Sequence, residues 1–202
     1  MTRALYAATL TTLCAGSLAA QSVAWSAGAS AVGVRAQSEG SRTTGTVFGG
    51  LASARFGRFE LEGHYLQGAL EARDLVQGQL AVAYDATPWL TARTAARARA
   101  YVTPAGTERW VTWLLGVRVE APLIGSTVRG DVGLWRALAL SANVGSTEGR
   151  SGRGGDAGIT WQIPSRPLWL RLAYGIDRSA VSGAGRRETL EAFTLTVGVR
   201  RH

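Results

Sequence analysis

Apolar and polar residues alternate at every second position through most of the chain. Residues 109–121, RWVTWLLGVRVEA, place Val111, Trp113 and Leu115 on one face and Thr112 and Arg118 on the other. Successive side chains of a β-strand point to opposite faces, so this period predicts a strand. The same period occurs in residues 29–37, 46–56, 59–69, 75–84, 90–102, 157–163, 168–177 and 189–200.

Residues 127–145 are harder to assign. One apolar phase runs from Val128 to Val144, but Arg136 interrupts it. We favour a single strand that starts late; the alternative is a short piece followed by a second strand. The chain then has about ten strands, and eight or twelve also fit the pattern.

The segment 90–100, LTARTAARARA, has three interpretations. Alanine and arginine both favour helix, and three arginines in eleven residues could form a basic arm that contacts phosphates. As a strand, the segment carries Arg93, Arg97 and Arg99 on one face and mostly alanine on the other. The surrounding alternation favours the strand.

Residues 1–20 have the features of a secretory signal peptide. Arg3 precedes an apolar stretch, and small residues stand before a cleavage point after Ala19 or Ala20. Removing this segment leaves one domain, residues 21–202, without cysteine, because Cys14 is the only one. No later run of about eighteen apolar residues predicts a helical span.

The strand lengths favour a membrane barrel over a soluble one. The clear segments have 9–13 residues in most cases, as a tilted strand needs to cross hydrocarbon, whereas soluble strands are usually nearer 5–6. The connections also alternate in length. Residues 57–58, 85–88 and 163–167 form short turns, and residues 38–44, 146–155 and 179–188 are expected to form longer loops.

Aromatic residues cluster beside the short turns, where a membrane-interface belt would lie. The alternative is that they fill a soluble core. The predicted interface residues are Phe56, Phe59, Tyr84, Trp89, Trp161 and Trp169.

Together these patterns resemble the small bacterial outer-membrane β-barrels, the OmpA/OmpX-like and OmpW-like group, over nearly all of the mature chain. The resemblance implies an all-β fold, an antiparallel up-and-down transmembrane barrel. It also implies that the chain lies in the bacterial outer membrane, and that its partners are outer-membrane lipid and, during biogenesis, the barrel assembly machinery.

The chain is basic, with a formal charge of +8, and every basic residue is arginine. Such a charge permits nucleic acid or anionic lipid as a partner, and export argues against nucleic acid. A lipid-facing arginine at mid-membrane costs about 2–4 kcal/mol, so the charged faces of the strands should point into the lumen. The predicted lumen residues are Arg93, Arg97, Arg99, Arg118, Arg171, Glu60, Glu62, His64, Glu120 and Asp177.

These charges have two interpretations. They either pair with one another and fill the interior, or form an anion-attracting constriction. With about ten strands, side chains fill most of the interior, which favours pairing.

The sequence shows little sign of catalysis. His64 shares a face with Glu62, but no serine partner is evident. The glycine-rich segments 45–50 and 152–158 precede no helix, as a phosphate loop would. We therefore predict no enzyme, no metal site and no cofactor. The predicted function is an outer-membrane barrel, structural or a narrow passive pore with an arginine-rich lumen. The alternatives are a secreted soluble barrel that binds a small apolar ligand and a lipid-modifying or proteolytic enzyme that uses His64.

Overall fold

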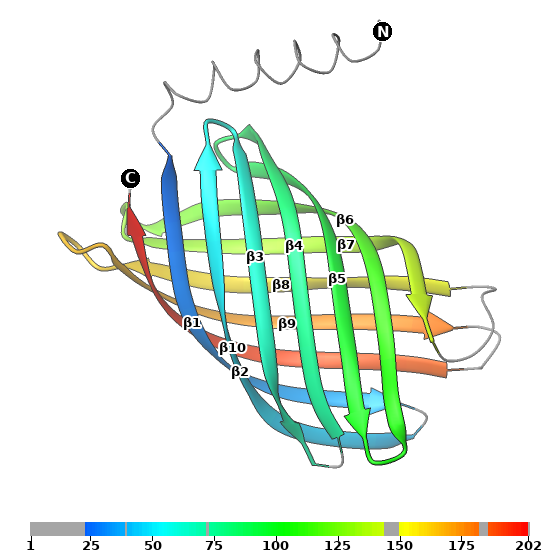
Figure 1. Ribbon diagram of the computed structural model, residues 1–202. Coiled ribbons are helices and arrows are strands. Elements are labelled where there is room, and N and C mark those ends of the chain that lie inside the picture. The colour runs from blue at the N-terminus through cyan, green and yellow to red at the C-terminus, as the bar shows by residue number, and fades with distance from the viewer. Residues whose placement is uncertain (1–22, 39, 72, 144–149, 182–185, 202) are drawn as a thin grey trace, which may run out of the picture.

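The computed structural model describes residues 23–38, 40–71, 73–143, 150–181 and 186–201 (Figure 1). The predicted signal peptide lies outside the described residues. The strands are β1 Ala24–Ser38, β2 Ser41–Phe56, β3 Phe59–Leu70, β4 Arg73–Thr87, β5 Leu90–Thr103, β6 Gly106–Ile124, β7 Val128–Ala142, β8 Arg150–Gln162, β9 Leu168–Val181 and β10 Arg186–Arg201.

The strands form one closed antiparallel barrel in which each strand pairs with its neighbours in sequence and β10 pairs with β1. Gly28 of β1 lies opposite Gly198 of β10. Strand β1 begins and β10 ends at the same end of the barrel, which we call the turn end (Figure 1). The opposite end is the loop end. The predicted fold class, an up-and-down barrel of about ten strands, is confirmed.

The strands are longer than the alternation predicted. Residues 39–40 alone connect β1 to β2, β8 already begins at Arg150, and β10 begins at Arg186. The prediction of longer loops at 38–44, 146–155 and 179–188 is therefore wrong over most of these residues. Backbone pairing continues there because a hydrogen-bonded ladder needs no apolar alternation.

The region near Arg136 forms the single strand β7, as favoured, but the strand begins at Val128 and does not start late. Its register shifts against β6 at Trp113/Leu114. The bulge does not account for Arg136, which faces outward with Val132 and Leu134. It reverses the face of the residues after Leu138, so that Leu140 is buried.

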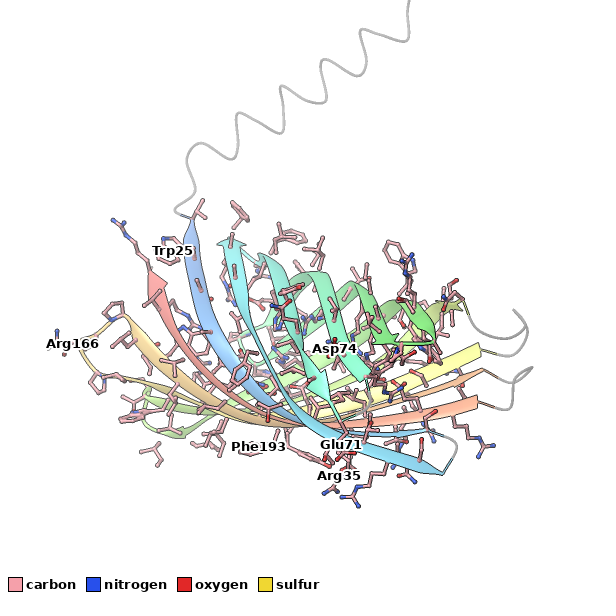
Figure 2. The ribbon with its side chains drawn as sticks, turned by 60° about the horizontal axis from the view of Figure 1, so that its bottom comes forward. Trp25, Arg35, Glu71, Asp74, Arg166 and Phe193 are labelled. Atoms are coloured by element: carbon pink, nitrogen blue, oxygen red, sulfur yellow. The ribbon has the colours of Figure 1, made fainter. Side chains whose placement is uncertain are left out.

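The outer wall of the barrel is apolar. Leu80, Leu134 and Phe48 keep 65%, 62% and 61% of their surface exposed. Figure 2 shows Phe193 projecting from the wall in the same way. The described residues contain no helix that could span a membrane.

Toward the loop end, strand β1 has apolar side chains inside the barrel and polar side chains on the outer wall. Val32, Val34 and Ala36 are buried in the interior, whereas Arg35 and Gln37 face outward and are exposed. The alternation predicted this strand correctly. It did not predict that the apolar face would be the inner one.

Candidate functional site in the barrel lumen

The charged side chains of the lumen lie in layers, and the layer nearest the turn end is open to solvent. Arg55 contacts the carboxylate of Glu60 at 2.5 Å and that of Asp85 at 2.8 Å, and keeps 48% of its side chain exposed. Arg129 pairs with Glu120 at the same end, also about half exposed. These pairs form the rim of the lumen.

The middle layer is a network centred on two arginines. Arg171 contacts the carboxylates of Asp131 and Asp156, and Arg118 reaches both acids at 3.5 Å. Glycine makes room for this network, because a Cβ at Gly158 would lie 2.7 Å from the Arg171 guanidinium. Gly154 and Gly158 of segment 152–158 therefore leave space inside the barrel for Trp135 and Arg171.

Glu62 lies beside this network and contacts Arg93 at 2.7 Å. The Nε2 atom of His64 lies 3.8 Å from Glu62 Oε2. The described residues place no hydroxyl or thiol within hydrogen-bond distance of the His64 ring. Among the described residues, His64 and Glu62 therefore form a histidine–carboxylate pair with no nucleophilic side chain beside it.

The next layer toward the loop end is buried, and we call it the deep charge layer: Arg97, Arg99, Tyr101, Asp177 and Glu188. Arg99 donates to Asp177 at 2.8 Å and to Glu188 at 2.9 Å, and Arg97 contacts Asp177 as well. The Tyr101 hydroxyl donates to Glu188 at 2.7 Å. Only 2% of the Glu188 side chain and 7% of the Arg99 side chain are exposed. A buried charge is tolerated when it is paired and hydrogen-bonded in this way.

Two glutamines complete the deep charge layer. Gln77 accepts a hydrogen bond from Arg99 Nε at 2.8 Å, and Gln79 accepts one from Arg97 Nε at 2.9 Å. The Arg99 guanidinium thus contacts two carboxylates and one amide, and the Arg97 guanidinium contacts one of each. These contacts satisfy several of the five N–H donors of each arginine.

An apolar cluster lies beyond the deep charge layer, and we call it the apolar seal. It draws buried side chains from β1 to β7 and from β10, so it crosses the interior. Its members are Val32, Val34, Ala36, Val47, Leu70, Leu75, Tyr101, Trp110, Leu140 and Leu190.

Between the rim and the apolar seal the lumen keeps a cavity of about 390 Å³. All the residues predicted to face the lumen line it: Arg93, Arg97, Arg99, Arg118, Arg171, Glu60, Glu62, His64, Glu120 and Asp177. Sequence reasoning missed Glu188, because it assigned residues 179–188 to a loop, and it missed the apolar seal. No set of His, Cys, Asp and Glu side chains able to hold a metal occurs among the described residues.

The aromatic residues fall into two groups on the outer wall. At the turn end Phe59, Tyr84, Trp89 and Trp161 are exposed, and Phe56 is partly exposed. A second set, which sequence reasoning did not single out, faces outward from near the middle of the strands: Phe48, Tyr65, Trp113, Tyr174 and Phe193.

Trp169 is the exception, and its prediction as an interface residue is wrong. Its side chain is only 5% exposed and lines the lumen cavity. It shares the inward phase of Arg171, and its ring lies over the paired Gly28 and Gly198, where a Cβ would contact it. Glycines at both positions leave the space that the ring occupies.

The similarity of this chain to known proteins is one of fold alone. No family model matches the chain, and no curated protein matches its sequence. Among solved structures, Neisserial surface protein A is similar, with 13% identity over 87% of this chain and 97% of that one and a TM-score of 0.44. The translocator domain of autotransporter NalP from Neisseria meningitidis has 11% identity over 98% and 96% of the two chains and a TM-score of 0.40. The N-terminal β-barrel domain of Pseudomonas aeruginosa OprF has 12% identity over 86% and 96%, with a TM-score of 0.34.

Proposed function

We propose that this chain is a bacterial outer-membrane β-barrel whose lumen is sealed, so that it serves as a structural membrane protein and not as an open pore. The observation that carries the proposal is the separation of side chains across the wall. Ion pairs lie inside the barrel, and the outer wall is apolar between two aromatic groups. A soluble barrel around an apolar ligand would need the opposite arrangement.

The spacing of the two aromatic groups supports a membrane. Phe48 and Phe56 are eight residues apart on β2. At about 3.3 Å per residue and a tilt of about 40°, they are separated by roughly 20 Å of height. The apolar band of an outer-membrane barrel is about 25 Å tall and is flanked by aromatic girdles. The orientation follows from the connections: the widest interval between consecutive strands, from Ala142 to Arg150, is at the loop end, and outer-membrane barrels have their longer loops outside. We therefore place the turn end in the periplasm and the loop end outside.

The apolar seal supports a closed lumen. Leu70 and Val47 have no exposed surface, Tyr101 has none, and the deep charge layer directly beneath is nearly dry. An ion would have to cross both layers. The remaining cavity forms a vestibule on the turn side.

The test has two stages. The full chain is expressed with its own N-terminal segment, outer membranes are isolated, and boiled and unboiled samples are compared by SDS gel electrophoresis. We expect a fast-migrating unboiled band in the outer-membrane fraction. Recovery in the soluble periplasm without a shift would contradict the membrane assignment. The purified barrel is then inserted into planar bilayers, where we expect no stable conductance steps; regular steps would contradict the seal.

A further inference from the structure

Three arginines face outward side by side near the loop end. Arg153 of β8 lies directly opposite Arg136 of β7 and directly opposite Arg178 of β9. All three are exposed. We call them the arginine row. Among the described residues, no ion pair neutralises any of them, because the lumen acids Asp156 and Asp177 on the same strands point to the other face.

Such a row is unfavourable by itself. Directly opposite residues of antiparallel strands have Cα atoms about 5 Å apart, and like charges at that spacing repel. Elsewhere this barrel avoids the problem: Arg35, which also faces outward, lies opposite Glu191 and contacts it at 3.2 Å. Among the residues that the structure describes, no acid lies opposite the arginine row in this way, which points to an anion from outside the chain.

The depth of the row indicates where that anion lies. On β9 the outward residues from Leu168 to Ile176 are apolar or aromatic, and Arg178 is the next outward position. On β7 Val132 and Leu134 precede Arg136 in the same way. Leu138 also faces outward beyond Arg136, so the arginines stand at the margin of the apolar band and not wholly beyond it. Figure 2 shows Arg35 projecting outward beyond Phe193, which gives the same order on the neighbouring wall.

We propose that the arginine row binds the phosphate groups of a phosphorylated glycolipid in the outer leaflet, of the lipid A kind. Guanidinium groups bind phosphate oxygens in a bidentate manner, and one phosphate between two adjacent arginines removes their repulsion. The inference rests on the proposed membrane location, because only then does a lipid headgroup reach this height.

The test uses the full barrel in vesicles that contain phosphorylated lipid A or its dephosphorylated form, with EDTA present so that divalent cations do not bridge phosphates. Retained lipid is measured after detergent extraction and purification. One variant carries R136Q, R153Q and R178Q. The matched control carries R58Q, R166Q and R201Q, which removes the same charge from exposed positions at the turn end.

We expect the wild type and the control to retain phosphorylated lipid A in preference to the dephosphorylated form. The R136Q/R153Q/R178Q variant should lose affinity by on the order of 100-fold. Equal retention of both lipids by the wild type, or equal losses in the two variants, would overturn the inference. Heat-modifiable migration is measured on the same samples. A folded barrel without lipid preference contradicts the arginine row alone, whereas failure to enter vesicles contradicts the proposed function.

Discussion

The two halves of the lumen hold their side chains in different ways. Near the turn end, Arg55 contacts Glu60 and Asp85 while 48% of its side chain remains exposed. Near the loop end, Arg99 contacts Asp177 and Glu188 with 7% exposed, and the apolar seal covers the layer. Arginine–carboxylate pairs are thus exposed to solvent in the half near the turn end and buried in the half near the loop end.

The comparison shows how one barrel combines a wet vestibule with a closed end. Exposed ion pairs contribute little to stability, because solvent screens them. Buried pairs are costly to break, because the remaining partner keeps its charge without water. The loop half should therefore dominate the stability of the barrel, and the following predictions test that difference.

The largest effect is expected for Arg99→Met. The change leaves Glu188 without its arginine in a site where 2% of its side chain is exposed. We expect the free energy of unfolding to fall by about 3–5 kcal/mol. Urea unfolding in detergent micelles, followed by tryptophan fluorescence, measures it. Arg55→Gln is the control at the open end, with an expected loss of about 0–1 kcal/mol. Equal losses would show that the two halves do not differ.

Leu70→Ala tests the apolar seal. Leu70 has no exposed surface, so its truncation leaves a cavity, and we expect a loss of about 2–5 kcal/mol. Leu80→Ala is the matched control on the paired strand, because Leu80 is 65% exposed on the outer wall, where lipid or detergent fills the space. Its expected loss is below about 1 kcal/mol. A larger effect at Leu80 than at Leu70 would place the core outside the lumen.

Gly198→Ala tests the packing of Trp169 near the turn end. A Cβ there would collide with the Trp169 ring and with the backbone oxygen of Ala27. We expect a loss of about 1–3 kcal/mol from overpacking. Gly33→Ala should be near neutral, since nothing lies within 4 Å of its Cβ position. Equal unfolding midpoints for the two variants would contradict the packing of Trp169 over the glycines.

The smallest effect is expected for His64→Ala. The ring is 39% exposed, and Glu62 keeps its contact with Arg93 at 2.7 Å. We expect a change within about 1 kcal/mol and an unaltered lipid A profile in cells that express the variant. An altered profile would instead support the enzyme alternative for His64.

Much of the site was predictable because strand alternation is a local property. Period two fixes which side chains share a face, and the cost of arginine in lipid then selects the inner face. This reasoning led to Arg93, Arg97 and Arg99, which line the lumen cavity. It gave the wrong side for Trp169, because a tryptophan beside a turn suits a membrane interface as well as an interior with glycines opposite it.

The local sequence pattern could not predict which residues these side chains contact. Arg99 and Glu188 are 89 positions apart and meet only because the barrel closes between β10 and β1. The arginine row likewise depends on the registers β7–β8 and β8–β9, which place Arg136, Arg153 and Arg178 in line. Strand register depends on pairing across the whole sheet, so a shift of one residue in any hairpin would separate them.

The sequence by itself determined the all-β class, the approximate number of strands and the phase of most faces, since these follow from periodicity and the energetics of charge in lipid. Only the tertiary structure decided that Val32, Val34 and Ala36 point inward to seal the loop end, although their alternation resembles that of lipid-facing strands. The reason is physical: an apolar face is stable against lipid or against another apolar face, and closure of the barrel determines which of the two it meets.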